Sequence, residues 1–400
     1  MSLNEVVSAE RLHIGFFGMR NAGKSSLVNA VTGLDLAVVS DVKGTTTDPV
    51  KKAMELLPLG PVVIIDTPGL DDEGELGTLR VQKARQMLDR TDIAVLVVDG
   101  TVGLGPQDEQ LLRLLRQRKI PYIIVLNKAD LLTRPEPAGE DTLYASAATG
   151  EGIHELKEKL GAFAKLLKKE NVLCSDLFAA GDVIVLVTPI DESAPKGRLI
   201  LPQQLTIRDI LDNHGIVVTC QQTQLKATLA ALGKKPRLVI TDSQVFEQVD
   251  RETPKDIMLT SFSILMARYK GDLKELVLGA AELCKLKEGD SVLICEGCTH
   301  HRQCNDIGTV KLPGWIEGFA GGKLRFSFTS GGDFPEDLSQ YALVVHCGGC
   351  MLNETQMKNR IARCREAGVP IVNYGIAIAR LHGILRRSLE PFPGIAGLLD

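Results

Sequence analysis

The chain has 400 residues, of which 44% are hydrophobic and 24% charged, a composition typical of a globular protein with room for two or three domains. A formal net charge of −4 and an aromatic content of 4% argue against a nucleic-acid-binding surface. No apolar run approaches the roughly 20 residues that span a bilayer, and the N-terminus lacks a signal-peptide pattern, so we expect a cytoplasmic protein without membrane contact. There the nine cysteines stay reduced, and clustered ones indicate metal binding.

The first motif is the segment 18–25, GMRNAGKS, which has the form G-x-x-x-x-G-K-S. It follows an apolar run at 13–17, which predicts a strand, and precedes a predicted helix at 26–31. A phosphate-binding loop requires this order, because glycines let backbone N–H groups converge on an anion at a helix N-terminus. Lys24 can reach the β- and γ-phosphates, and Ser25 can ligate Mg²⁺. The other loop residues expected to contact the nucleotide are Gly18, Asn21, Ala22, Gly23 and Ser26.

Two further segments are predicted to respond to the γ-phosphate. The threonine-rich segment 41–49 lies where a mobile switch would lie, and a threonine hydroxyl there can complete the Mg²⁺ shell. The continuous apolar run at 61–65 predicts a buried strand that ends in the sequence DTPG. Asp66 can hold Mg²⁺ through water, and the Gly69 N–H can meet the γ-phosphate.

The base would be recognised farther along the chain. Apolar runs at 93–99 and 122–126 predict strands, with a leucine-striped helix at 110–118 between them. The sequence NKAD follows the second strand, and the Asp130 carboxylate can accept both N1–H and N2–H of guanine. Adenine lacks these paired donors, so Asp130 would select GTP over ATP. Backbone N–H groups at 145–147 can contact the guanine O6. The residues expected at the base are Asn127, Lys128, Asp130, Ser146 and Ala147.

These motifs together resemble the Ras-like GTPases, most closely the TrmE–Era branch, from about residue 10 to 170. The resemblance implies hydrolysis of GTP to GDP and phosphate. Thr46 aligns best with the Mg²⁺-binding threonine, and Thr45 is the alternative. Leu70 stands where Ras-type enzymes place a water-orienting glutamine. Asn21 lies where cation-dependent members place a K⁺ ligand, which implies K⁺ stimulation; alternatively, Asn21 only accommodates a turn. The residues expected in catalysis are Lys24, Thr46, Gly69 and Asn21.

After a lysine-rich helix at 157–169, residues 171–262 alternate between predicted strands and helices, which indicates a small parallel α/β domain. No catalytic constellation is visible in it, so we expect an interaction or dimerisation role. His214 is predicted at a helix C-terminus, and Cys174 and Cys220 are predicted to be small buried hydrophobic residues. The strands predicted here are 182–187, 216–220 and 237–241, with helices at 203–214, 223–232 and from 244.

The last part of the chain, residues 263–400, predicts a second parallel α/β unit. Strands are expected at 291–295, 341–345 and 369–373, with a helix at 354–366. Cysteines follow the first two strands, at the sheet edge where open α/β sheets place their ligands. Two sites fit: a Cys₄ zinc site on Cys295, Cys298, Cys347 and Cys350, or a [4Fe–4S] cluster on the last three. Three thiolates leave one iron open, and the nearby candidates for it are His300, His346, Glu296 and Asp306.

The GTPase motifs followed by C-T-H at 298–300 and H-C-x-x-C at 346–350 resemble the HydF family of [FeFe]-hydrogenase maturation GTPases over the whole chain. The resemblance favours the cluster over zinc. It implies a dimeric or larger scaffold that delivers a diiron precursor to apo-[FeFe]-hydrogenase, with the radical-SAM maturases as partners. Cys295 and Cys304 are additional cysteines near the motif whose roles stay open.

We therefore predict a Ras-like P-loop GTPase domain at 1–170, a dimerisation domain at 171–262 and an iron–sulfur domain at 263–400, the last two being smaller parallel α/β domains. GTP, Mg²⁺, K⁺ and a [4Fe–4S] cluster are the expected cofactors. The alternative is a ribosome- or tRNA-associated GTPase with a zinc-stabilised C-terminal domain.

Overall fold

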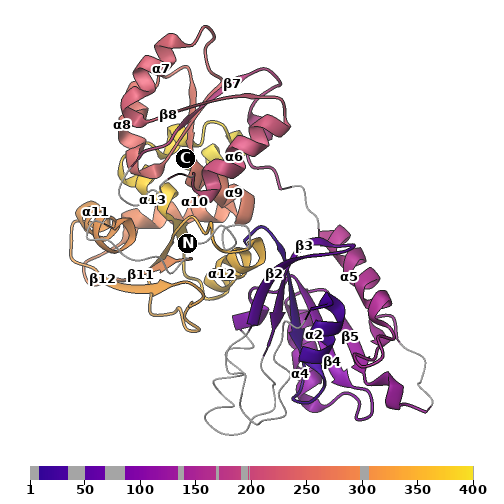
Figure 1. Cartoon of the computed structure of the whole chain (residues 1–400). Helices are drawn as coiled ribbons and strands as arrows, with labels where there is room; N and C mark the ends of the chain where they lie inside the picture. Colours follow the sequence, from indigo (N-terminus) through magenta and orange to yellow (C-terminus); the bar gives the residue numbers. More distant parts are fainter. Residues whose placement is uncertain are drawn as a thin grey trace. The chain divides into compact units, whose positions relative to one another are not determined.

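The computed structural model describes residues 9–34, 50–67, 86–133, 139–167, 171–190, 197, 199–297 and 306–399 (Figure 1). Several predicted site residues lie outside the described residues: Thr45, Thr46, Gly69, Leu70, Cys298, His300 and Cys304. The chain divides into two compact units, 2–170 and 171–400. The division predicted near residue 262 stays a prediction.

The unit at 2–170, indigo to magenta in Figure 1, is built on a sheet with the strand order β2-β3-β1-β4-β5-β6. All neighbours are parallel except β2 and β3, which form an antiparallel pair. The strands are β1 (Leu12–Phe17), β2 (Val50–Leu56), β3 (Gly60–Asp66), β4 (Ile93–Asp99), β5 (Tyr122–Asn127) and β6 (Thr142–Tyr144). The helices are α2 (Lys24–Thr32), α4 (Pro106–Gln117) and α5 (Ile153–Leu167).

Side chains along the central strands point alternately to the two faces of this sheet, and helices cover both faces. In β4, Ile93, Val95 and Val97 pack with the apolar residues of α2 and α5. Ala94, Leu96 and Val98 pack with the leucines of α4 on the opposite face. A strand that is buried on both faces is apolar throughout, which explains why its sequence is a continuous apolar run. The carboxyl ends of β1, β3 and β5 consequently meet at one edge of a three-layer structure.

The unit at 171–400 contains two parallel sheets in its described part, with the orders β10-β9-β7-β8 and β12-β11-β13-β14. The strands of the first are β7 (Val183–Val187), β8 (Ile216–Cys220), β9 (Leu238–Thr241) and β10 (Met258–Ser261). Those of the second are β11 (Ser291–Glu296), β12 (Arg325–Ser330), β13 (Leu343–His346) and β14 (Ile371–Asn373). The α-helices are α6 (Leu201–Asp212), α7 (Leu225–Ala231), α8 (Phe246–Glu252), α9 (Phe262–Lys270), α10 (Leu273–Glu282), α11 (Leu312–Ala320), α12 (Glu354–Glu366), α13 (Tyr374–Leu381), α14 (Leu385–Ser388) and α15 (Pro393–Ala396).

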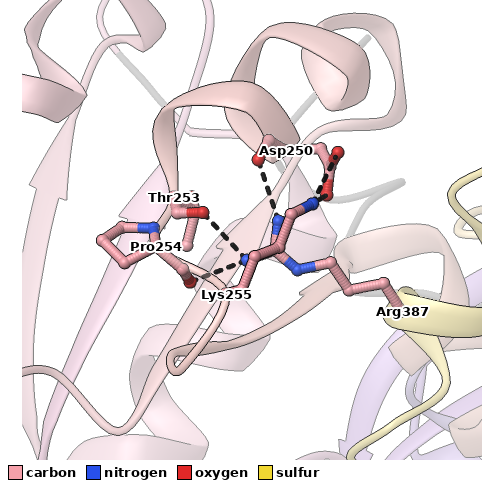
Figure 2. A network of polar contacts seen from close by, with 5 residues as sticks. All are labelled: Asp250, Thr253, Pro254, Lys255 and Arg387. Atoms are coloured by element: carbon pink, nitrogen blue, oxygen red, sulfur yellow. Dashed lines mark hydrogen bonds and ion pairs between the residues drawn. The ribbon is translucent and has the colours of Figure 1, made fainter.

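One buried hydrophobic cluster joins the two sheets of this unit, because residues of both sheets and of the helices α9, α10 and α13 pack within it. A buried arginine adds a polar connection (Figure 2). Arg387 of α14 is 8% exposed and donates to the Asp250 carbonyl at 2.8 Å, the Asp250 carboxylate at 2.5 Å, the Thr253 carbonyl at 2.9 Å and the Pro254 carbonyl at 2.8 Å. The helix α14 is thus held against the end of α8 and the loop that leads from α8 to β10.

The predicted fold class, a Ras-like P-loop domain followed by parallel α/β structure, is confirmed. Cys174 and Cys220 are buried as predicted, and Cys295 is fully buried. Sequence reasoning missed the edge strands β2, β10 and β12, which mix charged or hydroxylated residues with apolar ones and form no continuous apolar run. No described helix combines the length and the apolar character needed to cross a bilayer.

Candidate functional site

The phosphate-binding loop connects β1 to α2, and neighbouring atoms leave no room for side chains at two of its glycines. A Cβ atom on Gly18 would lie 2.0 Å from the carbonyl oxygen of Val97. On Gly23, whose φ is 87°, a Cβ would lie 2.2 Å from the side-chain nitrogen of Asn127. Asn21 is exposed and adopts a left-handed φ of 61°, a conformation that asparagine tolerates better than most residues.

Lys24 opens α2 with Gly23 as its N-cap residue, and it is 8% exposed. Its ammonium group donates to the carbonyl oxygens of Gly18 at 2.9 Å and Met19 at 2.7 Å, so the side chain folds back over its own loop. Within the described residues no side chain caps this helix. The helix dipole and the lysine charge both favour an anion at this position.

Asp66 ends β3 beside the loop, is 7% exposed and accepts a hydrogen bond from the Ser25 hydroxyl at 2.8 Å. Burial raises the pKa of Asp66, while the Ser25 hydroxyl and the Lys24 charge oppose that rise. In the described part of the chain, the other carboxylate oxygen, Oδ1, is buried without a hydrogen-bond partner. A hydroxyl and a buried carboxylate with an unpaired oxygen fit a hard divalent cation such as Mg²⁺.

The predicted base-binding residues lie at the carboxyl ends of β5 and β6. Asn127 bridges two segments, since its side-chain nitrogen donates to the Ala22 carbonyl at 2.9 Å and its oxygen accepts from the Ala147 amide at 3.1 Å. Lys128 pairs with Asp99 at 2.5 Å. Asp130 is exposed in a 3₁₀ turn, so its carboxylate is accessible to a ligand. The fold brings these residues together, and their contacts to a base stay predictions.

The Ser146 and Ala147 amides, predicted to contact guanine, are already used within the protein. Ser146 N–H donates to the Glu151 carbonyl at 2.9 Å, and Ala147 N–H donates to Asn127. A guanine O6 would share or displace the second of these bonds. Asp99, which orients Lys128, was not predicted, although it ends the β4 run and could have been found from its position.

The second candidate site lies where β11 and β13 end. The Cys347 amide donates to the Cys295 carbonyl at 2.8 Å, which joins the two strand ends. The Cys347 sulfur accepts backbone N–H groups from Gly297 at 3.0 Å and Gly349 at 3.4 Å. Burial and the neighbouring Cys350 thiol raise the pKa of Cys347 to about 12, while the two amides and Arg360 act in the opposite direction.

His346 precedes Cys347 and is fully buried. Arg360 of α12 donates to its Nε2 at 2.8 Å, and Nδ1 lies 2.8 Å from the Cys347 carbonyl oxygen. Because a guanidinium only donates, Nε2 must accept, which places the ring proton on Nδ1. Burial and the Arg360 charge lower the pKa of His346 to about 3, which keeps the ring neutral. Both ring nitrogens are therefore hydrogen-bonded, and the role of His346 as an iron ligand stays a prediction.

Over the described residues, no three histidine, cysteine, aspartate or glutamate side chains come together to hold a metal. Cys347 and Cys350 are described and partly buried, whereas the third predicted ligand, Cys298, lies outside the described residues. Sequence reasoning missed Arg360, since an arginine within an amphipathic helix gives no sign of the histidine it will contact.

Three family models match the chain. Residues 173–271 match the hydrogen maturase F dimerization domain, and residues 274–391 match the hydrogen maturase F tetramerization domain. The chain belongs to the hydrogen maturase F (HydF) family. Residues 13–128 match a model described as a 50S ribosome-binding GTPase, so this family member carries a GTPase domain. The two HydF matches favour the hydrogenase-maturation prediction over the ribosome- or tRNA-associated alternative.

Curated relatives align with the GTPase part of this HydF-family chain. GTPase Der of Kosmotoga olearia is 33% identical over 170 residues, which cover 38% of this chain and 38% of the relative. The tRNA modification GTPase MnmE of Legionella pneumophila is 41% identical over 157 residues, covering 38% and 34%. The chain thus spans little more than a third of the length of these relatives.

Solved structures with similarity include Era of Aquifex aeolicus bound to GDP and AlF₄⁻, at 20% identity and a TM-score of 0.35, covering 55% of this chain and 98% of that one. A probable GTP-binding protein EngB is 24% identical with a TM-score of 0.32, covering 38% and 99%.

Proposed function

We propose that this HydF-family chain is a Mg²⁺-dependent GTPase and a [4Fe–4S] scaffold that delivers a diiron precursor to apo-[FeFe]-hydrogenase, with the radical-SAM maturases as partners. The observation that carries the proposal is the HydF match over both C-terminal segments together with the amide-lined Cys347 sulfur at the sheet edge. The proposal places two functions at two separate sites. One site hydrolyses GTP, and the other holds the cluster.

In the first site, Lys24 and the N-terminus of α2 would bind the phosphates, and the Asp130 carboxylate would bind the guanine. Ser25 and Asp66 would hold Mg²⁺, which supplies positive charge to the β- and γ-phosphate oxygens when bound. Asn127 positions the base-binding loops by joining Ala22 to Ala147. Thr46 and Gly69 are proposed at the γ-phosphate, as predicted from the sequence.

In the second site, Cys347, Cys350 and Cys298 would hold the cluster, which supplies an iron position not occupied by cysteine. The Cys347 environment fits such a group, since thiolate sulfur is the usual ligand of iron–sulfur clusters and two amides aim at this sulfur. Deprotonation of a thiol with a raised pKa then accompanies binding. The hydrogen bond from Arg360 holds the His346 ring in one tautomer and anchors the end of β13, which Cys347 follows.

The matched dimerization domain contains an exposed sheet edge. β8 is an edge strand, and Ile216 at its start is 49% exposed. An edge strand presents unpaired backbone groups that can template pairing with a second chain. We propose that the β8 edge contributes to the homodimer, with larger assembly through residues 274–391.

K⁺ stimulation is proposed on Asn21, whose exposed side chain stands on the phosphate-binding loop. Measuring GTP turnover in matched K⁺ and Na⁺ buffers tests it. Several-fold faster turnover in K⁺ supports the proposal, and equal rates contradict it and leave only the turn role that the left-handed φ of Asn21 already explains.

The decisive experiment is anaerobic purification followed by analysis of iron, sulfide and zinc, with EPR after reduction. About four irons and four sulfides per chain and a fast-relaxing S = 1/2 signal support the cluster. Activation of apo-hydrogenase by the loaded protein then tests delivery. Stoichiometric zinc without iron, persisting through anaerobic reconstitution, contradicts the scaffold role and leaves the GTPase.

A further inference from the structure

Three neighbouring parallel strands end together at the cysteine site. Cys295 of β11, His346 of β13 and Asn373 of β14 are in register. The residues that follow them, Glu296, Cys347 and Tyr374, therefore form the next row across the edge of the sheet. Tyr374 is the first residue of α13, and Asn373 caps that helix by accepting the Ile376 amide at 2.8 Å. The cap fixes the turn that places Tyr374 beside Cys347.

The Tyr374 hydroxyl is buried in this row, and none of the described residues pairs with it. The residue is 9% exposed, and within the described chain its oxygen accepts or donates no hydrogen bond. A Cβ atom on Gly308 would lie 2.4 Å from the Tyr374 oxygen and 2.5 Å from Glu296 Oε1, so the hydroxyl and the Glu296 carboxylate converge on the same glycine. An unpaired buried hydroxyl costs desolvation free energy, and such groups in native proteins usually serve a ligand or store strain.

A phenol O–H can donate a hydrogen bond, and the strand register places Tyr374 in the row of Cys347 at the cysteine site. A sulfur-ligated iron group carries net negative charge and accepts hydrogen bonds at its sulfurs, and such bonds tune its potential.

We propose that Tyr374 is a ligand-binding residue of the cysteine site, whose hydroxyl donates a hydrogen bond to the iron–sulfur group held by Cys347 and Cys350. This inference rests on the proposed function. It assigns to the hydroxyl a partner that the described residues do not provide, and it predicts opposite effects of removing the hydroxyl before and after iron is loaded.

The test compares Tyr374→Phe with Tyr341→Phe in the full-length protein. Tyr341 packs against the same hydrophobic cluster but precedes β13, at the end of the strand opposite Cys347, so it is a matched control. Each protein is reconstituted with iron and sulfide under argon. The measurements are the thermal midpoint before reconstitution, the reduction potential by EPR-monitored titration, and the rate of iron loss to a chelator.

For Tyr374→Phe we expect a metal-free midpoint equal to or above that of the wild type, because the unpaired hydroxyl is gone. The loaded variant should have a lower reduction potential, since one bond that stabilises the more negative reduced state is missing. It should also lose iron about three- to tenfold faster, the factor that a single hydrogen bond supplies. Tyr341→Phe should leave the potential and the rate of iron loss unchanged.

A lowered metal-free midpoint would show that the hydroxyl already has a protein partner and would overturn the inference. An unchanged potential and rate of iron loss in Tyr374→Phe would also overturn it, while wild-type loading would leave the scaffold proposal standing. Wild-type protein that takes up no iron would overturn the proposed function, and the inference with it.

Discussion

The two candidate sites occupy the same place in their folds, the carboxyl edge of a parallel sheet, but they are assembled differently. In the GTPase unit, a continuous loop supplies its own contacts, since Lys24 bonds to Gly18 and Met19 within the loop. In the C-terminal unit, Cys347 is held by Gly297, which is 50 residues away in the chain. The phosphate-binding loop is therefore local in sequence, although Asp66 and Asn127 reach it from distant strands, whereas the surroundings of Cys347 depend on correct pairing of β11 with β13. Changes in the first should stay local, and changes in the core of the 171–400 unit should reach the second.

The largest expected effect is a loss of GTP turnover with no change in iron content, and it tests whether the two sites are independent. Lys24→Ala removes the charge proposed to bind the phosphates, and we expect GTP turnover to fall by about 100-fold or more. Iron uptake should be unchanged, because the variant does not touch the cysteine unit. GTP hydrolysis and iron content are measured on the same preparations. Loss of iron in Lys24→Ala would contradict separate sites.

The reciprocal change is Cys347→Ser. A serine oxygen is a poor ligand for iron–sulfur clusters, so we expect iron and sulfide to fall nearly to zero while GTP turnover stays at the wild-type rate. Cys284→Ser is the control, since Cys284 is an exposed cysteine of the same unit. Full iron content in Cys347→Ser, or equal loss in Cys284→Ser, would argue against the assigned ligand.

The dependence of the cysteine unit on long-range contacts is tested by Arg387→Met. Removing the buried guanidinium leaves the carbonyls of Thr253 and Pro254 without this donor, while the Asp250 carboxylate keeps its ion pair with Lys255, and we expect the free energy of unfolding to fall by about 3 kcal/mol. Chemical denaturation measures it, and the loss should appear in the transition of the 171–400 unit.

Arg208→Met is the matched control for that change. Its ion pair with Asp212 spans one turn of α6, and the Arg208 side chain is 77% exposed, so the expected cost is about 0–1 kcal/mol. Equal destabilisation by the two substitutions would show that the Arg387 contacts add nothing to the stability of the unit.

The choice between nucleotide bases tests the part of the nucleotide site that contains Asp130. Asp130→Asn replaces the carboxylate acceptor with an amide, which matches xanthine better than guanine, and we expect the preference to shift toward xanthosine triphosphate by about 100-fold. Competition between the two nucleotides in a turnover assay measures the shift. A variant that still prefers GTP would contradict the guanine assignment.

The smallest expected effect concerns the sheet edge of the dimerization domain. Ile216→Lys places a charge on the exposed edge strand β8, and we expect the homodimer to weaken by about tenfold, as measured by analytical ultracentrifugation. Val102→Lys, at an 81% exposed position in the GTPase unit, is the control and should leave assembly unchanged. Unaltered dimerisation in Ile216→Lys would place the interface elsewhere.

Most of the nucleotide site could be predicted from the sequence because each of its parts ends a strand whose apolar run is visible. Ser25, Asp66, Asn127 and Asp130 all follow such runs, and parallel strands bring their carboxyl ends together. The edge strands β2, β10 and β12 were missed for the opposite reason. β12, for example, alternates polar and apolar residues, and that pattern in a six-residue segment does not distinguish a strand from a loop.

The sequence by itself determined the fold class, the phosphate-binding loop and the pairing of cysteines with strand ends, because these are encoded in local runs, glycine positions and spacing. Only the tertiary structure decided what surrounds the cysteines. It placed Arg360 on His346 and aimed the amides of Gly297 and Gly349 at the Cys347 sulfur. It also left the Tyr374 hydroxyl buried beside them, without a partner among the described residues. The register between strands from distant parts of the chain sets those contacts, and a single sequence does not display that register.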